Sequence, residues 1–542
     1  MVLIMGLSEA SPEHDPPARS LAWLTLAFVG LCFGAGRWEV PVASPLGLVF
    51  LVRFFRHTPP RVAVPLSTVA LAASAIISSW GMNPSPLPSL VATYLMTGLL
   101  TAALLAVDRW LARRLDHFVA TLALPALDVA LVAISASAQP FGTWGLSAYA
   151  LFGELPLLQT ASLTGVWGVE FLLIWVATVA NWAWDRGFDP ARVRRGAGVF
   201  AAIVLGLSAW GGWRLNRSGL SAPTARVAGI TVDTQGVLPL PRLLALLSEP
   251  QPPETWEALR PRFAALNDRL FALTEREARA GARVVVWSEG NAAVLAADEA
   301  ALLARAQAAA RELEIELALA VAVWHPTGPH RLSNKVLWVR PTGALAWEYL
   351  KARPVPGPEA DHSARGDGRM RTVDTAVGRY GVAICFDGDF PAQLRQARAL
   401  GVDVVVSPSQ DWPAITPQHS QMIAFRAIED GVTYFRQTNR GLSLVTDPWG
   451  RTLGRMDHFA ASDRVLVAQV PTRGVSTVYG ALGDWFPGVC LLGAVALVAQ
   501  GLRTHPRRSG RGGGALASRA RLDGASGADD TPPGDAWSRG GS

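Results

Sequence analysis

The chain has 542 residues, of which 50% are hydrophobic and only 17% are charged. About a quarter of the residues of soluble globular proteins are charged, so this composition excludes a disordered or fibrous protein and is unusual for a soluble enzyme. The formal net charge is +6, and the three cysteines, Cys32, Cys385 and Cys490, cannot form a disulfide framework.

The apolar residues gather in charge-poor stretches at the two ends of the chain. A membrane-spanning helix needs about 20 apolar residues, with about 17 as the lower limit. Six of eight stretches reach that limit, and the first two are either tilted spans or a re-entrant pair. In chain order the stretches are 21–36, 40–52, 62–80, 89–107, 118–137, 165–184, 196–213 and 485–502.

Arginines mark one side of this predicted membrane region. They follow the second, fourth, sixth and eighth stretches, whereas the connections 81–88 and 138–164 contain no Lys or Arg. Short basic loops stay in the cytoplasm, so the N-terminus is predicted inside and the segment after the seventh span outside. The positive charge is therefore mainly a topology signal, and no nucleic acid partner is expected.

Residues 222–475 alternate apolar runs of strand length with helical stretches rich in Ala, Arg and Glu. This alternation is typical of an α/β sandwich with buried sheets. Strands are predicted at 226–232, 283–287, 317–323, 336–340, 381–385, 402–407 and 442–445. Helices are predicted at 256–280, 296–313, 391–400 and 418–431.

The predicted organisation therefore has five parts. A cytoplasmic N-terminus (1–20) precedes a transmembrane domain of about seven helices (21–215) and the outer catalytic domain (222–475). A last transmembrane helix (480–502) leads into a tail (503–542) rich in Gly, Ser, Arg and Asp. A segment with so few large apolar residues is predicted to be disordered in the cytoplasm.

Three side chains with useful chemistry stand out, two at predicted strand ends and one at the start of a loop. Glu289 ends Val-Val-Val-Trp-Ser-Glu, Cys385 ends Gly-Val-Ala-Ile-Cys, and Lys351 begins a loop rich in proline. Considered separately, Glu289 is interpreted as a solvated turn residue, Cys385 as a small buried apolar residue, and Lys351 as a surface amine. Taken together, Glu289 can activate a thiol whose ordinary pKa is about 8.5, and Lys351 can stabilise an oxyanion. The chain's other lysine, Lys335, has no role that the sequence identifies.

This Glu, Lys and Cys set resembles the nitrilase superfamily, and the membrane spans narrow the resemblance to the apolipoprotein N-acyltransferases. The resemblance covers roughly residues 20–500 and implies a polytopic α-helical membrane protein of about 8 spans that carries an extracytoplasmic α/β/β/α nitrilase-like sandwich. Motifs that carry it are Arg331-Leu-Ser-Asn334, His419-Ser-Gln-Met422, Arg426-Ala-Ile-Glu429, Gln437-Thr-Asn-Arg-Gly441 and Asp447-Pro-Trp-Gly450.

The resemblance implies a role for each site residue. Glu289 is the general base, Lys351 stabilises the oxyanion, Cys385 is the nucleophile, and Glu359, Phe386 and Asp387 support them, Phe386 through its backbone N–H. It implies ping-pong transfer from a phospholipid such as phosphatidylethanolamine, through a cysteine thioester, to the N-terminal diacylglyceryl-cysteine of an apolipoprotein. No metal and no organic cofactor are implied. The implied location is the bacterial cytoplasmic membrane, with the catalytic domain on the extracytoplasmic face.

Several positions depart from the family pattern. Ser288 stands where the family usually has proline, and Phe386 and Asp387 stand where it usually has tyrosine and glutamate. These departures leave the three central residues intact but keep other functions open. The alternatives are a divergent paralogue that acylates another amine, a membrane-tethered nitrilase-type amidase, and an inactive scaffold that keeps the fold.

Overall fold

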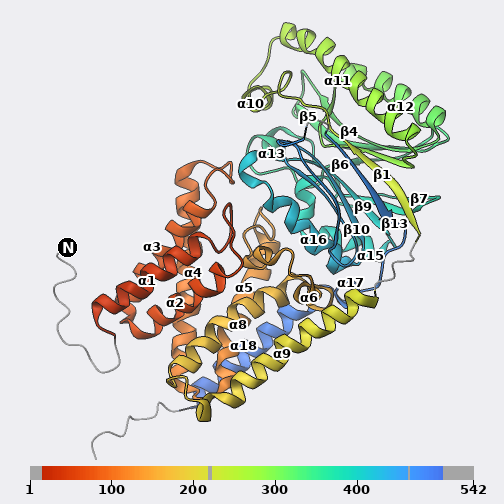
Figure 1. The fold of residues 1–542 in the computed structure, drawn as a ribbon. Coiled ribbons are helices and arrows are strands. Elements are labelled where there is room, and N and C mark those ends of the chain that lie inside the picture. The colour runs from red at the N-terminus through yellow and green to blue at the C-terminus, as the bar shows by residue number, and fades with distance from the viewer. Residues whose placement is uncertain (1–14, 218–222, 462–463, 505–542) are drawn as a thin grey trace, which may run out of the picture.

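A computed structural model describes residues 15–217, 223–461 and 464–504, and it consists of a helical region beneath a sandwich of two sheets (Figure 1). The predicted disordered tail, 503–542, lies outside the described residues from residue 505 on. Residues 1–14 of the predicted cytoplasmic N-terminus also lie outside them.

Among the described residues, the helical region contains six helices that are long and apolar enough to cross a membrane, and they coincide with the six longer predicted stretches. They are α3 (Pro60–Ser78), α4 (Leu87–Arg114), η1 (Phe118–Leu122) continuing into α5 (Ala123–Ala138), α8 (Val166–Trp184), α9 (Pro190–Arg217) and α18 (Trp485–Arg503). Short helical turns connect α5 to α8, namely η2 (Ser147–Leu151), α6 (Leu155–Leu158) and α7 (Ala161–Thr164). The prediction of a polytopic helical region is therefore confirmed.

The two short stretches form helices α1 (Pro17–Cys32) and α2 (Ala43–His57). With 16 residues, α1 is about 24 Å long, which is less than the hydrocarbon thickness of about 30 Å. The pair packs closely at two glycines, because a Cβ on Gly30 would lie only 2.7 Å from the Cα of Gly47. In α2 about half of the residues are buried, including Phe54 and Phe55, so this pair is an integral part of the helical region.

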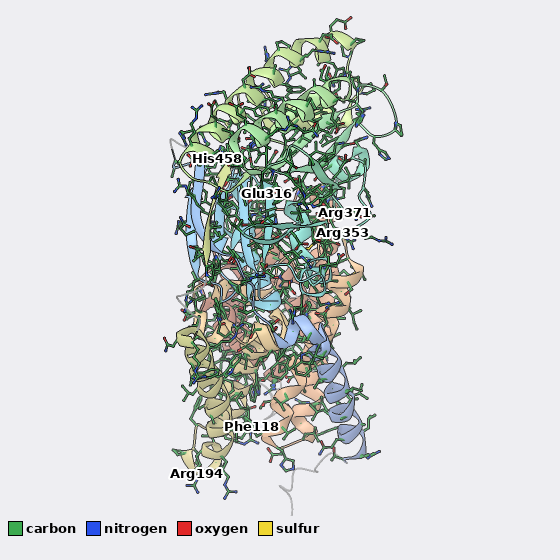
Figure 2. All side chains as sticks on the ribbon, turned by 90° about the vertical axis from the view of Figure 1, so that its right-hand side faces the viewer. Phe118, Arg194, Glu316, Arg353, Arg371 and His458 are labelled. Carbon is green, nitrogen blue, oxygen red and sulfur yellow. The ribbon has the colours of Figure 1, made fainter. Side chains whose placement is uncertain are left out.

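The arginine-rich connections lie together at one end of the helical region. Arg114 donates to the backbone oxygen of Gly501 (3.0 Å), which joins the end of α4 to the end of α18. Arg56, at the end of α2, pairs with Asp108 of α4 at 2.9 Å. Figure 2 places Phe118 and Arg194 near the end of the molecule opposite the sandwich. The connections without Lys or Arg are at the other end, against the sandwich, as described below.

The sandwich has two mixed sheets packed face to face. Strands of the first lie in the order β13-β1-β2-β4-β5-β6, with β3 paired to β4, and those of the second in the order β12-β11-β10-β9-β8-β7. The first sheet contains β1 (Thr224–Ile230), β2 (Val284–Trp287), β3 (Ala292–Leu295), β4 (Glu316–Trp324), β5 (Leu332–Val339), β6 (Leu345–Leu350) and β13 (Val465–Pro471). The second contains β7 (Thr372–Thr375), β8 (Gly378–Val382), β9 (Val404–Gln410), β10 (Thr433–Asn439), β11 (Leu442–Thr446) and β12 (Thr452–Asp457).

Buried side chains of both sheets form one core between them, in which Trp338 of the first sheet contacts Tyr380 of the second. Helices α11 (Pro253–Arg279) and α12 (Glu299–Leu313) cover the outer face of the first sheet, and α16 (Gln418–Asp430) covers the second (Figure 1). The predicted α/β/β/α fold class is therefore confirmed.

Several elements differ from the predicted ones. Strands β3, β6, β7, β10, β12 and β13 and helix α10 (Leu240–Ser248) were not predicted. Polar residues interrupt the apolar pattern of β10, which contains Arg436 and Asn439, and β6 and β12 are only partly buried. The helix predicted at 391–400 is instead two short ones, α14 (Pro391–Leu394) and α15 (Gln396–Ala399).

Helix α16 forms one of the contacts between the sandwich and the helical region. Met422, Phe425 and Ile428 pack among membrane-region side chains that include Tyr149 and Val166. The helix ends where Gly431 takes a φ of +69°, a left-handed conformation that glycine adopts without strain. A helix buried on both sides fixes the sandwich on the helical region.

Phe425→Ala tests this contact. The Phe425 ring is fully buried and packs edge-on against Tyr149, with ring centroids 4.9 Å apart. Truncation leaves a cavity, so we expect the free energy of unfolding to fall by about 3–5 kcal/mol in chemical denaturation of the detergent-solubilised protein. Phe459→Ala is the matched control because the Phe459 side chain is 51% exposed. Equal losses in the two variants would contradict the proposed packing role of Phe425.

Candidate active site

Sheet topology brings the three predicted residues to one place. Strand β2 runs parallel to β4, and β5 and β6 each pair antiparallel to the strand before, so β2 and β6 run in the same direction. Glu289 follows β2 and Lys351 follows β6, so both lie where these two strands of the first sheet end, on the same side of the sheet. Cys385 follows β8 of the second sheet, and the packing of the two sheets places it opposite these strand ends.

The Lys351 ammonium lies between two carboxylates. Its Nζ donates to Oε1 of Glu289 at 2.7 Å and to Oε1 of Glu359 at 2.8 Å. The side chains of Lys351 and Glu289 are only 2% and 5% exposed. Asn334 Nδ2 donates to Glu289 at 2.7 Å and to Glu359 at 3.3 Å, and the Val355 N–H donates to Glu359 at 2.9 Å. Each carboxylate is thus held by several donors.

This arrangement keeps Lys351 charged. Burial alone lowers the pKa of a lysine, but Glu289, Glu359 and the nearby Cys385 outweigh burial and raise the pKa of Lys351 well above its ordinary value. A permanently protonated amine fixed in a water-poor site is suited to stabilise a developing oxyanion.

Cys385 is a strained and buried thiol. Its φ is +47°, in the left-handed region that non-glycine residues adopt at a cost of about 1–3 kcal/mol. The side chain is 2% exposed, and Sγ lies 3.6 Å from the backbone oxygen of Gln410. Burial is the largest cause that raises the pKa of Cys385 well above its ordinary value, and the Glu289 charge is the next largest. The charges of Lys351 and Arg436 oppose this rise. A thiol in this environment therefore needs a base to form a thiolate.

Asp387 ties the cysteine turn to the lysine loop. The turn is the short helix η4 (Cys385–Asp389), and Asp387 accepts hydrogen bonds from the backbone N–H of Ile384 (3.0 Å) and of Arg353 (2.8 Å). It also accepts the Tyr349 hydroxyl at 2.7 Å. Phe386 lies in the first turn of η4, where backbone N–H groups have no partner within the helix. Aspartate is shorter than the glutamate that the family usually has at this position, but Asp387 still reaches donors on both the cysteine turn and the lysine loop.

Ser288 also has a structural consequence. Its backbone N–H donates to the oxygen of Ile230 at 3.1 Å, which extends the pairing of β1 with β2 by one residue. Proline has no N–H and cannot make this bond. The strand end before Glu289 therefore has one backbone hydrogen bond that a proline at position 288 would remove.

Four further charged side chains lie beside the thiol and were not predicted as site residues. They are Asp389 of η4, Asp411 after β9, His419 of α16 and Arg436 of β10, and together they are called the buried charge cluster below. His419 contacts Asp411 through Nδ1 at 2.8 Å and Asp389 through Nε2 at 3.0 Å. Arg436 donates to Asp411 at 2.7 Å. No sequence spacing links these residues, because four separate elements supply them.

Atoms of Cys385, Asp411 and His419 lie within 4.8 Å of one another, which is a spacing that metal ligands can have. The residues present do not fit a metal ion. Both ring nitrogens of His419 already face carboxylates, and the Arg436 guanidinium, 2.9 Å from Nδ1, supplies the positive charge at this position. We therefore derive no chemistry from a metal here.

Two adjoining cavities open onto the site. The larger has a volume of about 340 Å³ and is lined by Glu289, Lys351 and Glu359, together with leucines of α10. The smaller, of about 40 Å³, contains Cys385 and Phe386. Residues that line both cavities are Pro84, Val355, Gln410 and Trp412. The thiol and the ammonium therefore face adjoining cavities, which share these four residues in their walls.

Connections of the helical region form part of this space. Gly81 and Pro84, between α3 and α4, line the larger cavity, and Trp412 donates to the backbone oxygen of Gly81 at 2.9 Å. Trp144, between α5 and α8, lines the smaller cavity. The membrane region thus supplies walls of the candidate active site.

The sequence also left Lys335 and Asn334 without a role. Lys335 pairs with Glu299 at 2.6 Å and with Glu348 at 3.2 Å, away from the thiol, so its role is structural. Asn334 is a site residue, since it contacts both glutamates. The motif Arg331-Leu-Ser-Asn334 was the only signal that could have identified it.

The titration of Asp387 gives a testable pH dependence. Burial raises the pKa of Asp387 from 3.8 to about 6, although its hydrogen bonds oppose this. The folded protein therefore binds the proton of the Asp387 carboxyl more tightly than the unfolded chain does. The stability that protonated Asp387 contributes is complete below about pH 4 and is lost as the pH rises through 6. Between pH 4 and pH 7, we expect the stability of the wild type relative to Asp387→Asn to fall by up to about 3 kcal/mol in denaturation curves.

Asp367→Asn is the control for this experiment. Asp367 is exposed and pairs with Arg371, and hydrogen bonds, first from the Arg369 N–H, lower its pKa. The stability that Asp367 contributes is lost as the pH falls, which is the opposite direction. A difference in the free energy of unfolding between the wild type and Asp387→Asn that stays constant between pH 4 and pH 7 would contradict the raised pKa of Asp387.

Comparison with known proteins agrees with this architecture. Residues 253–478 match the family model of the carbon-nitrogen hydrolases. An apolipoprotein N-acyltransferase of Geobacter metallireducens is 26% identical over 532 residues, which covers 92% of this chain and 94% of the relative. One of Bradyrhizobium diazoefficiens is 26% identical and covers 67% of this chain and 70% of its own.

Among solved structures, an amidase from Nesterenkonia sp. aligns with 47% of this chain and 94% of its own, with 18% identity and a TM-score of 0.36. The match to the carbon-nitrogen hydrolase model lies in the sandwich, whereas the similarity to the acyltransferases includes the membrane region. The sandwich therefore matches the carbon-nitrogen hydrolase model, and the chain as a whole is similar to apolipoprotein N-acyltransferases.

Proposed function

We propose that the protein transfers an acyl chain from a membrane phospholipid to the α-amino group of the N-terminal diacylglyceryl-cysteine of apolipoproteins. The observation that carries the proposal is the combined site. A buried thiol and an ammonium held by two carboxylates line adjoining cavities, and loops of the helical region form part of the walls. The names of the relatives support the same reaction.

In the first half-reaction, Glu289 takes the proton of the Cys385 thiol, and the thiolate attacks the ester carbonyl of the phospholipid. The Lys351 ammonium and the Phe386 N–H stabilise the oxyanion of the tetrahedral intermediate. Collapse of the intermediate breaks the ester bond, and the leaving alkoxide takes the proton back from Glu289. The products are a Cys385 thioester and a lysophospholipid.

In the second half-reaction, the α-amino group of the acceptor attacks the thioester carbonyl. Glu289 accepts the proton of the amine and returns it to the Cys385 thiolate as the C–S bond breaks. The product is an amide, and the enzyme is regenerated. A thioester retains enough activation for amide formation, so this ping-pong scheme needs no other co-reactant.

The position of the site fits lipid substrates. Drawing an acyl chain from the bilayer into water costs about 0.8 kcal/mol per CH₂ group. Cavity walls from membrane-region loops, such as Gly81 and Trp144, let the reacting ester stay near the bilayer surface. The basic connections lie opposite the sandwich, which supports a cytoplasmic-membrane location with the sandwich on the extracytoplasmic face.

Lys351→Met tests the mechanism. In proteoliposomes that contain phospholipid with a labelled sn-1 chain, we expect the wild type to acquire hydroxylamine-sensitive label on Cys385. Loss of one oxyanion donor is expected to slow labelling by about 10²–10³-fold in Lys351→Met. Cys385→Ala should acquire none. Lys335→Met is the matched control, since that lysine only pairs with Glu299 and Glu348.

Equal labelling of Lys351→Met and Lys335→Met would contradict the role of Lys351. Release of ammonia from small amides without any acylated protein would instead favour an amidase. If Cys385→Ala and the wild type give the same result in both assays, neither reaction depends on the thiol, and an inactive scaffold is favoured.

Deletion of the gene tests the acceptor. We expect mass spectrometry of lipoprotein N-terminal peptides to show triacylated peptides in wild-type cells and diacylated peptides in deletion cells. Complementation with Lys335→Met should restore the third chain, and complementation with Cys385→Ala should not. Persistence of triacylation in deletion cells that contain no second such enzyme would overturn the assigned acceptor.

A further inference from the structure

The buried charge cluster (Asp389, Asp411, His419 and Arg436) combines two anions with two basic groups. Burial, and then Arg436, lower the pKa of His419, but Asp389 and Asp411 outweigh them and raise the pKa of His419 above its ordinary value. The Asp411 and Arg436 side chains are fully buried and pair at 2.7 Å. With His419 protonated, the four charges cancel.

The cluster lies directly beside the thiol. Ligand atoms of Cys385, Asp411 and His419 are within 4.8 Å of one another, and Arg436 is near enough to stabilise a thiolate at Cys385. The charged groups that face Cys385 come from both sheets. They are Glu289 after β2, Lys351 after β6, Asp411 after β9, His419 on α16 and Arg436 on β10.

The same cluster contacts the connection between α5 and α8. The backbone oxygen of Asp389 accepts two hydrogen bonds from Thr143, one from its N–H at 3.0 Å and one from its hydroxyl at 2.9 Å. The Trp144 ring packs edge-on against His419, with centroids 5.6 Å apart. The residue that ends the cysteine turn is therefore also an attachment point for the helical region.

We propose that the buried charge cluster positions Cys385, places its cationic groups His419 and Arg436 beside the thiolate, and fastens the cysteine turn to the membrane-region segment of Thr143 and Trp144. Its members are positioning residues, because they act through Cys385. The inference rests on the proposed role of Cys385 as the nucleophile. Lys351 then stabilises the thiolate from the first sheet, and His419 and Arg436 do so from the second.

Alkylation of Cys385 by iodoacetamide tests the proposal in the full-length, detergent-solubilised protein without any lipid donor or acceptor. The rate is followed against pH by mass spectrometry of the Cys385 peptide. His419→Gln removes a cation about 5 Å from the thiol, so the midpoint of the pH profile is expected to rise by about 1–3 pH units. A purely structural role would leave this midpoint unchanged.

Glu429→Gln is the matched control. Glu429 is another fully buried side chain of α16, and it accepts the backbone N–H of Val166 in the membrane region at 2.6 Å. It pairs with Arg426, which lies outside the buried charge cluster. The midpoint of Glu429→Gln is expected to equal that of the wild type.

Asp411→Asn gives an independent test, because it removes a negative charge that opposes the thiolate. Its midpoint is expected below the wild-type value, so it decides the question alone if His419→Gln does not fold. An unchanged midpoint in folded His419→Gln, or an unchanged or raised midpoint in Asp411→Asn, would overturn the proposal. Because the assay needs no acyl donor, its failure is distinguishable from failure of the acyltransferase function.

Discussion

The site depends on one buried interaction, in which the Lys351 ammonium is held between Glu289 and Glu359. A buried ion pays a desolvation cost of several kcal/mol, which opposite charges offset only when their geometry is good and their remaining hydrogen bonds are made. Asn334 and the Val355 N–H make those bonds to the carboxylates. The group is therefore stable only where β2, β5 and β6 are all in register, and this ties the chemistry to the order of strands in the first sheet.

The second sheet supplies the thiol under a comparable constraint. Cys385 has an unfavourable φ, and such strain persists only where the surroundings fix the chain firmly. Asp387 provides part of that support, because it holds the start of the cysteine turn and the segment after Lys351 together. The departures at Ser288 and Asp387 thus have local explanations in backbone hydrogen bonds, and the central group of Glu, Lys and Cys is preserved around them.

The helical region takes part in the site as well as carrying it. Helix α16 is buried between the second sheet and membrane-region side chains, and its His419 reaches the thiol from that position. Gly81, Pro84 and Trp144 complete the cavity walls. An enzyme that acts on lipids gains from this arrangement, because the segments that meet the bilayer also shape the space around the reactive groups.

The sequence by itself determined the features that depend on local composition. Apolar length identified the six long membrane helices, and alternating patterns identified the sandwich and most of its fully buried strands. The side chains at strand ends pointed to Glu289, Lys351 and Cys385 as one group. Strands β6 and β10 were missed because partial exposure and internal polar residues removed the apolar pattern that marks a buried strand.

Only the tertiary structure decided which polar residues surround the thiol. His419 belongs to one of the motifs that carry the resemblance, but nothing in the sequence places it with Asp411 and Arg436 beside the thiol. Their convergence follows from the packing of α16 and β10 against the cysteine turn. The same holds for the contact of Thr143 with Asp389, which joins segments 246 residues apart. Long-range electrostatics of this kind depends on distances through space, which the order of residues along the chain does not contain.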